Sequence, residues 1–370
     1  MDKNKVNVTQ ISLLLLLVIT GGKFLSLPSI LSKDVGHDSW LVIVVAFAWD
    51  LIGLCFLLWG IKMNKDQLSF DAILNKTLSK VGSKIVLVIF FVMFMCRTLV
   101  LLDSCYTTFA VTFDVSTNWI LFILPIIAVA AFAIYRGFNS IARVSQVLFA
   151  LIILSIVAIL VYPTTQVQFS YLMPFGEVGA GKIFATAFLR SFWFSDYVFI
   201  YFVLGDLKPQ KYVFTPILTS FCVGVALTVL LNAVFVAMFG SFAEFENIAM
   251  SKIGMFSVSE STDGRWDWIT LTVWLTSVMI KIIIFIFCSY KCVEKLFGFH
   301  FQKVNLPVMA VLSAILVIPM FIPIITVVEK FVYWCLIPFA IVQYLLPLLM
   351  PLLTKLAHKS PKLEVINEQP

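Results

Sequence analysis

Ionisable side chains inside long apolar runs are the residues of this sequence that could carry out chemistry. There are seven of them, and they are Lys23, Asp50, Arg97, Asp103, Arg190, Asp196 and Lys281. A charge inside the hydrocarbon of a membrane is costly, so such residues usually pair with one another or contact a ligand or an ion. At about 1.5 Å of helix rise per residue, their depths predict three pairs: Asp50 with Arg97, Asp103 with Arg190, and Asp196 with Lys281.

This matching of depths leaves Lys23 without a carboxylate. A buried ammonium needs a counter-charge, which a free amino acid supplies through its own carboxylate, so we expect Lys23 to contact a ligand. Two alternatives stay open: burial holds Lys23 in its neutral form, or Lys23 shares Asp196 with Lys281. The Asp196–Lys281 pair is either structural or part of a proton relay, and Lys281 is also placed to stand in for a bound sodium ion.

The stretch around Lys23 predicts a break in the first membrane-spanning helix. Residues 19–28 read Ile-Thr-Gly-Gly-Lys-Phe-Leu-Ser-Leu-Pro. Glycines are poor helix formers, and Pro28 cannot donate a hydrogen bond to the carbonyl of Phe24. Non-helical backbone at membrane depth is tolerated only where it is buried in protein or lines a cavity, as in transporters with discontinuous helices. The alternative is a simple proline kink, from which Lys23 reaches the surface. The ligand contacts predicted here are Thr20, Gly21, Gly22, Lys23 and Phe24.

A second polar stretch, at residues 188–197, lies in the sixth apolar run. It holds Arg190, Asp196, two serines and a dense aromatic group, but no glycine or proline. The aromatic rings could enclose an apolar side chain of a ligand, or its amine through a cation–π contact. The ligand contacts predicted from this stretch are Ser191, Phe192, Trp193, Ser195 and Asp196.

The composition places these stretches in a polytopic membrane protein. Of the 370 residues 61% are hydrophobic and 12% charged, and the mean hydropathy is +1.03, which is far from the composition of soluble proteins. The net charge of +6 does not indicate nucleic-acid binding, because no basic patch interleaved with aromatic residues is present. The cysteines and histidines show no metal-binding spacing, and no catalytic motif is found. We therefore expect neither an enzyme nor a cofactor.

Ten apolar runs are long enough to span a membrane. They cover about 8–31, 39–61, 84–111, 118–134, 142–163, 183–204, 213–239, 267–291, 306–325 and 328–354. With the N-terminus in the cytoplasm, 17 of the 26 basic residues fall on the cytoplasmic side, so both termini are expected there. Breaks in spans one and six predict a single all-α transmembrane domain over 1–370, with inverted repeats at about 8–163 and 183–354 and a cytoplasmic tail at 355–370.

Three segments give the sequence a resemblance to a known family. They are Gly-Gly-Lys-Phe-Leu-Ser-Leu-Pro-Ser at 21–29, Gly-His-Asp-Ser-Trp at 36–40, and Tyr-Arg-Gly-Phe-Asn-Ser-Ile-Ala-Arg-Val at 135–144. Together with the length, the ten spans and the short tails, they resemble the B subunit of Ger-type spore-germinant receptors. The third segment, with Arg136, Gly137 and Arg143, is similar to that family's most recognisable motif. Its arginines either anchor the loop at the cytoplasmic surface or dock an acidic surface of a partner.

The resemblance implies a LeuT-type inverted-repeat fold of the amino acid–polyamine–organocation superfamily. It also implies a place in the inner membrane of the endospore, beside an A subunit and a C-subunit lipoprotein. The expected function is binding of a small nutrient germinant, an amino acid in the first instance, between spans one and six, with signalling to the partner subunits. Two other functions stay open: a proton- or sodium-coupled solute transporter, and a subunit that scaffolds or lines an ion-conducting complex.

Overall fold

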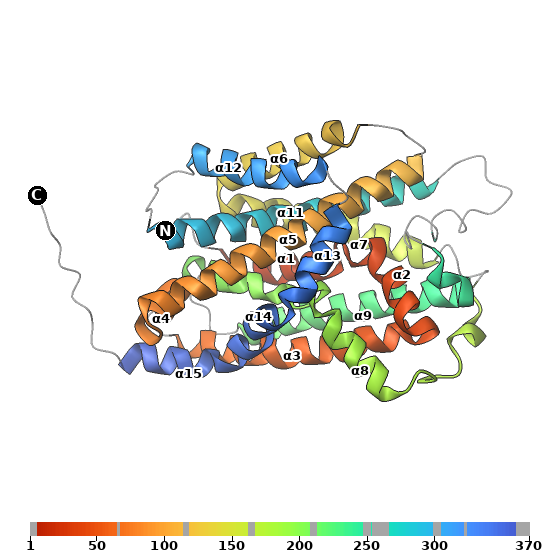
Figure 1. The fold of residues 1–370 in the computed structure, drawn as a ribbon, viewed down its shortest axis with the longest axis horizontal. Coiled ribbons are helices and arrows are strands. Elements are labelled where there is room, and N and C mark those ends of the chain that lie inside the picture. Colours follow the sequence, from red (N-terminus) through yellow and green to blue (C-terminus); the bar gives the residue numbers. More distant parts are fainter. Residues whose placement is uncertain are drawn as a thin grey trace, which may run out of the picture.

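The computed structural model describes residues 6–64, 67–113, 118–161, 167–207, 213–246, 253, 266–298, 305–321 and 324–359. Within these ranges the regular secondary structure is helical, apart from one isolated bridge between Val6 and Leu207. The helices make an elongated bundle in which most of the long helices run along the long axis (Figure 1). This confirms the all-helical, polytopic class expected from the composition.

The first apolar run is two helices separated by Gly21 and Gly22. Helix α1 covers Val8–Thr20 and α2 covers Lys23–Val35. Gly22 has a φ of 84°, which a side chain would strain, and a Cβ on Gly21 would lie 2.9 Å from the carbonyl oxygen of Ser277. The predicted break is therefore present but shorter than expected, since α2 continues through Pro28. Pro28 lies in the second turn of α2, so the only hydrogen bond lost there is with the carbonyl of Phe24.

The rest of the first half follows the predicted order. The 3₁₀ turn η1 at Gly36–Asp38 leads into α3 at Ser39–Met63, and α4 at Phe70–Thr77 is short. Three long helices follow, which are α5 at Lys80–Phe113, α6 at Trp119–Arg136 and α7 at Phe138–Val161.

The sixth apolar run is also discontinuous. After the 3₁₀ turn η3 at Phe169–Leu172, helix α8 covers Ala180–Leu189, a single turn η4 covers Ser191–Trp193, and the 3₁₀ helix η5 covers Asp196–Asp206. Between η4 and η5, Phe194 is extended and Ser195 is left-handed, with φ 59° and ψ 36°. A break thus forms here without glycine or proline.

Of the last four predicted spans, the first two are regular helices and the last two are divided into shorter pieces. Helices α9 at Phe214–Phe239 and α11 at Trp266–Phe297 are continuous, and η6 at Gly240–Glu244 follows α9. Beyond them come α12 at Leu306–Val317, η7 at Ile318–Phe321, α13 at Ile324–Trp334, α14 at Leu336–Ala340, the π-helix η8 at Ile341–Leu345 and α15 at Leu346–Lys359. Leu306–Phe321 and Thr326–Trp334 meet at 114°. The tenth run, expected at about 328–354, is divided by a turn at Cys335 between α13 and α14, and the last candidate span is Leu336–His358.

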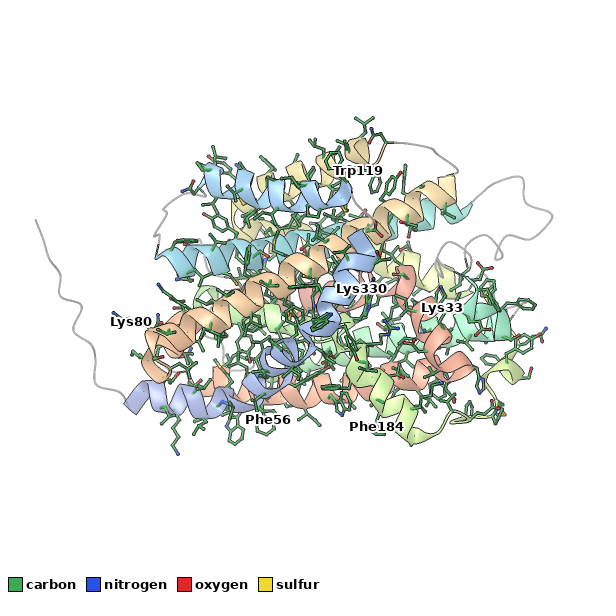
Figure 2. All side chains as sticks on the ribbon, viewed as in Figure 1. Lys33, Phe56, Lys80, Trp119, Phe184 and Lys330 are labelled. Carbon is green, nitrogen blue, oxygen red and sulfur yellow. The ribbon has the colours of Figure 1, made fainter. Side chains whose placement is uncertain are left out.

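Among the described residues, seven helices are long and apolar enough to cross a membrane, or eight if the bent pair counts as one span. Three shorter apolar helices flank the two breaks, at Val8–Thr20, Ala180–Leu189 and Asp196–Gly205. The count of ten spans stays a prediction that treats each broken pair as one crossing. Lys80 and Lys33, which the charge pattern puts on opposite sides of the membrane, lie toward opposite ends of the bundle (Figure 2).

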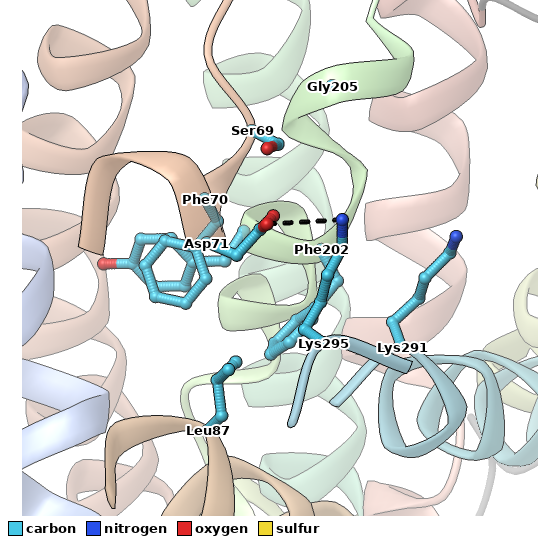
Figure 3. Close-up of a pocket in the computed structure, with 9 residues that line it drawn as sticks. Ser69, Phe70, Asp71, Leu87, Phe202, Gly205, Lys291 and Lys295 are labelled. Atoms are coloured by element: carbon cyan, nitrogen blue, oxygen red, sulfur yellow. Dashed lines mark ion pairs between the residues drawn. The ribbon is translucent and has the colours of Figure 1, made fainter. Parts of the chain in front are cut away.

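Helix α4 closes the end of the bundle at which α15 also lies. Its residue Asp71 pairs with Lys295 near the end of α11, at 3.3 Å, beside a small pocket of about 100 Å³ (Figure 3). Phe70 packs against the buried Tyr201 of η5, with their ring centroids 4.5 Å apart and the rings tilted by 31°. Aromatic rings are therefore packed together at this end of the bundle.

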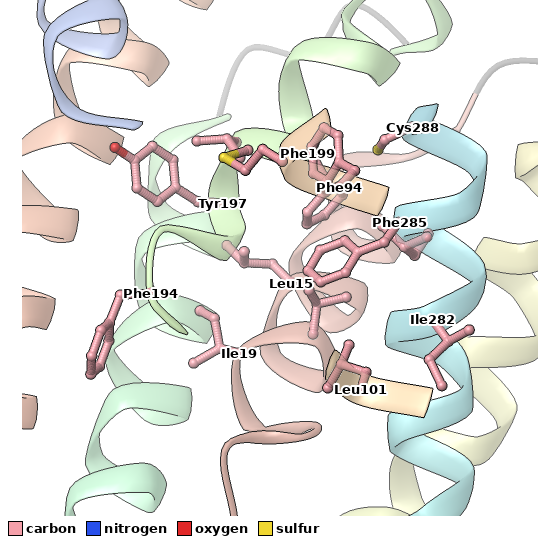
Figure 4. Packing of buried hydrophobic residues seen from close by; sticks show 14 of the residues in the cluster. Leu15, Ile19, Phe94, Leu101, Phe194, Tyr197, Phe199, Ile282, Phe285 and Cys288 are labelled. Atoms are coloured by element: carbon pink, nitrogen blue, oxygen red, sulfur yellow. The ribbon is translucent and has the colours of Figure 1, made fainter. Parts of the chain in front are cut away.

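The core is built around α1, which packs against α7, α9 and α11. Leu15 and Ile19 of α1 are fully or almost fully buried. Figure 4 shows them surrounded by labelled side chains of α5, η5 and α11. A helix that is apolar on all sides is typically buried. The C-terminal end of α1, at Thr20, is fully buried within this core.

Candidate functional site

The two broken spans meet at the carboxylate of Asp196, the first residue of η5. Its Oδ2 atom accepts hydrogen bonds from Lys23, the first residue of α2, and from Lys281 of α11, whose Nζ lies 2.9 Å away. Nη1 of Arg97, from α5, lies 3.6 Å from the other oxygen, Oδ1. One carboxylate thus binds three cations from three separate helices, and it joins the first break to the second.

Lys23 was predicted to lack an acidic partner, and this is wrong. The depth matching assigned Asp196 to Lys281 alone, whereas the structure places both ammonium groups on the same oxygen. This was the alternative in which Lys23 shares Asp196. Lys23 also donates to the carbonyl of Ile19, which the break exposes, at 3.3 Å, and it lies 5.4 Å from the ring centroid of Phe47. The pairing of Asp196 with Lys281 is as expected.

Asp50 does not pair with Arg97 as predicted. Its two oxygens accept hydrogen bonds from the backbone N–H and the hydroxyl of Ser195, both at 2.6 Å. Arg97 instead donates to the carbonyl of Phe194 and stacks its guanidinium over Phe192, 5.6 Å from the ring centroid. Depth alone could not reveal this, because each charge also binds a backbone group at the second break, the N–H of Ser195 or the carbonyl of Phe194.

The predicted pair of Asp103 with Arg190 is also wrong. Arg190 donates from Nε and Nη2 to the two oxygens of Asp34, at 2.7 and 2.9 Å. Among the described residues Asp103 makes no ion pair. Asp34 was missed because we expected the first span to end near residue 31, whereas α2 continues to Val35 and carries Asp34 toward the end of α8.

The charges of this cluster do not balance. Lys23, Lys281 and Arg97 face the carboxylates Asp196 and Asp50, and these five side chains are between 1% and 4% exposed in the residue as a whole. If all five are ionised, one positive charge is left over. A buried surplus charge is strongly unfavourable, so either a lysine is neutral or an anionic group completes the cluster.

Two polar residues of the site had no place in the sequence argument. The hydroxyl of Tyr197 donates to the backbone carbonyl of Gln343, at 2.9 Å. With its amide oxygen turned toward Arg97, the Gln343 side chain accepts from Nη2 at 3.1 Å and donates to the carbonyl of Ser191 at 3.2 Å. Gln343 lies in the π-helix η8, a form that is frequent at functional sites. A single amide in a long apolar run was the signal that could have identified it.

A cavity of about 430 Å³ lies next to the second break, along α8 from Lys182 to Arg190. Phe192 and Trp193 of η4 line it together with Arg190 and Asp34, and α13 contributes Val328, Glu329, Val332 and Tyr333. Thr20 and Phe24, also predicted as ligand contacts, are buried away from it, and the Thr20 hydroxyl donates to the carbonyl of Leu16 at 3.0 Å. Of the predicted ligand contacts, Lys23 and Asp196 therefore belong to the buried charge cluster, Phe192 and Trp193 line the cavity, and Thr20 and Phe24 belong to neither.

The loop motif lies between α6 and α7, apart from this site. The N–H of Gly137 closes α6 on the carbonyl of Ile134, and Gly137 has a φ of 89°, a conformation that favours glycine. Arg136 and Arg143 are exposed, whereas Ile141 and Ala142 are buried. Their exposure is compatible with both expectations, anchoring of the loop at the cytoplasmic surface and docking of an acidic surface of a partner.

Metal-binding side chains are not gathered anywhere in the described part of the chain. No group of three or more His, Cys, Asp or Glu side chains is close enough there to hold an ion. At the cluster itself the groups facing Asp196 are ammonium and guanidinium, which donate hydrogen bonds and do not ligate cations.

Comparisons with known proteins identify a family and a fold. Residues 5–354 match the family model described as "Spore germination protein". A search of curated proteins finds no match to the chain. Among solved structures, a mutant of the Eremococcus coleocola manganese transporter is similar, with a TM-score of 0.50 and 10% identity over 95% of this chain and 76% of that one. At this identity the likeness shows the fold alone.

Proposed function

The chain belongs to the spore germination protein family, and we propose that it is the ligand-sensing membrane subunit of a germinant receptor. It is an integral membrane protein and not an enzyme. Its ligand is a small nutrient molecule, an amino acid in the first instance, which acts where spans one and six are broken. It signals to an A subunit and a C-subunit lipoprotein in the inner membrane of the endospore, with both termini in the cytoplasm.

One observation carries this proposal: the Asp196 carboxylate joins the two broken spans beside a cavity of about 430 Å³. Small-molecule sites commonly measure about 300–1,000 Å³. Breaks in the first and sixth spans support an inverted-repeat arrangement of five plus five helices, in which ligands bind at the breaks. The likeness to a transporter fold supports the same arrangement.

The cluster is suited to a switch because its interactions are few and mutually dependent. A ligand can shift an equilibrium between two arrangements only by its difference in affinity for them, and such coupling is typically about 1–3 kcal/mol. A ligand in the adjacent cavity would contact Phe192, the ring over which the Arg97 guanidinium stacks, and would thereby weaken the hold of the cluster on η5. The partner subunits would then detect the altered position of η5 relative to α2.

Spores that lack this gene provide the test. We expect them to lose the response to at least one amino acid of a nutrient panel, and the wild-type gene to restore it. The control is a second strain restored with the Lys62→Met variant, which changes an exposed lysine at the end of α3 and should behave as wild type. An unchanged response of the deletion strain to every nutrient would overturn the proposal.

A solute transporter is the second candidate, favoured by the fold likeness and by the Asp196–Lys281 contact, which could relay a proton. Uptake of labelled amino acid into vesicles containing only the purified chain distinguishes the two. Uptake that follows a proton or sodium gradient supports the transporter, and binding without uptake supports the sensor.

A further inference from the structure

The cavity of about 430 Å³ beside the second break, called the outer cavity from here on, combines charges of both signs with an apolar floor. Arg190 and Lys182 supply positive charge, and Asp34 and Glu329 supply negative charge. The floor consists of aromatic and aliphatic side chains, among them Trp193 and Val332. Such a lining, with two groups of each sign, differs from the buried cluster around Asp196, where three basic side chains face two acidic ones.

Two of these charged groups are poised to take a ligand. Asp34 occupies Nε and one Nη2 hydrogen of Arg190, and Nη1 makes no hydrogen bond with the described residues. A carboxylate that binds an arginine by two hydrogen bonds needs two N–H donors in one plane. The edge of the Arg190 guanidinium formed by Nη1 and the remaining Nη2 hydrogen offers such a pair. On α13, Glu329 also lines the cavity, close enough to Arg190 for their charges to interact, and it makes no ion pair within 4.0 Å with the described residues.

The Arg190–Asp34 pair also fixes the geometry of the cavity. Its two hydrogen bonds join the end of α8 to the end of α2, with the side chains about a third and a quarter exposed. The guanidinium is therefore held in place before any ligand arrives, and preorganised groups bind more tightly because less freedom is lost. Glu329 belongs to a different helix, so a ligand that contacts both would draw α13 toward α8.

We propose that this outer cavity binds an α-amino acid with a bulky apolar side chain, its carboxylate on Arg190 and its ammonium on Glu329. The side chain rests on Trp193 and Phe192, the latter being the ring over which Arg97 of the buried cluster stacks. The ligand thereby touches a residue that also contacts the cluster. This inference rests on the proposed sensing function and adds to it the place and the class of the ligand.

Calorimetric titration of the full chain in lipid nanodiscs tests the inference with three probes: L-leucine, L-leucinamide and 4-methylpentanoate. The first has both charges, the second lacks the carboxylate, and the third lacks the ammonium. We expect L-leucine to bind, and each analogue to bind about tenfold or more weakly, since a hydrogen bond to a charged group contributes about 1.5–3 kcal/mol.

Variants then assign each charge to its residue. Glu329→Gln should weaken L-leucine to the level of 4-methylpentanoate and leave 4-methylpentanoate itself unchanged, and Arg190→Gln should abolish the preference for L-leucine over L-leucinamide. Lys330→Gln, the neighbour of Glu329 that does not line the cavity, is the matched control and should bind as wild type.

The inference is overturned if L-leucine does not bind the wild-type chain, or if Glu329→Gln weakens L-leucine and 4-methylpentanoate equally. These outcomes are separate from the germination test. A chain that is required for germination but does not bind L-leucine overturns only the site. A chain that binds L-leucine but is not required for germination overturns only the receptor function.

Discussion

The Asp50 carboxylate on α3 holds Ser195 by two hydrogen bonds of 2.6 Å, one from its backbone N–H and one from its hydroxyl. Ser195 is the left-handed residue that immediately precedes η5 in the break of span six. A left-handed conformation costs a non-glycine residue about 1–2 kcal/mol, so this break exists because a neighbouring helix compensates for it. The position of Asp196, the next residue, follows from this contact.

Replacing Ser195 separates the contribution of its hydroxyl hydrogen bond from the cost of its left-handed conformation. Ser195→Ala loses the hydroxyl bond and keeps the strained conformation, whereas Ser195→Gly loses the same bond and relieves the strain. We expect both variants to be less stable than wild type, and the glycine variant to be more stable than the alanine variant by about 1 kcal/mol. Thermal unfolding in detergent, monitored as the loss of monodisperse protein, measures the order of stability of wild type and the two variants. Equal stability of the two variants would show that Asp50 does not hold a strained turn.

Removal of the Asp196 charge should destabilise the whole junction. Asp196→Asn leaves Lys23, Lys281 and Arg97 without their shared carboxylate, and breaking a buried ion pair in this way costs about 3–5 kcal/mol. The second change Lys281→Met removes one of these cations, so we expect the double variant to regain part of the lost stability. The amount of folded protein in membranes and its unfolding temperature check both expectations. A double variant less stable than Asp196→Asn alone would contradict the assignment.

The first break depends on a close approach of two backbones. A Cβ on Gly21 would lie 2.8 Å from the Ser277 hydroxyl and 2.9 Å from the Ser277 carbonyl oxygen, so α11 cannot stay in place beside an alanine. Gly21→Ala should therefore lower the unfolding temperature and the germination response together. Gly181→Ala in α8, where an added Cβ meets nothing within 4 Å, is the control and should change neither. A stable Gly21→Ala variant would mean that α1 and α11 do not pack this closely.

Sequence reasoning located the two breaks because their signals are local. The two glycines beside Lys23 disfavour a helix wherever they occur, and the serines and charges at 188–197 are polar enough to stand out in an apolar run. The same reasoning failed at Pro28, because a proline in an early turn of a helix interrupts few hydrogen bonds. It also failed at Cys335, where a turn divides a run of continuous apolar residues.

The charge partners could be predicted only in part, because the sequence indicates the depth of a residue in the membrane but not its position within the membrane plane. Asp196 and Lys281 share a depth and also a direction, and they do pair. Asp50 and Arg97 share a depth, but Asp50 binds the Ser195 backbone, and no sequence pattern shows which backbone N–H a break will free. Asp34 was excluded by an error of about one turn in the end of α2. The role of each residue in ligand binding stays a prediction.

The most direct test of the central claim, that the ligand is sensed at the junction of the two breaks, is the half-maximal germinant concentration of spores carrying Lys23→Met. The amino acid used is the one that triggers wild-type spores most strongly. Asp196 keeps Lys281 and Arg97 in this variant, so the protein should reach wild-type levels in the spore membrane. We predict a half-maximal concentration several-fold higher than in wild type and in the Lys62→Met control. An unchanged value at wild-type protein levels would contradict the claim.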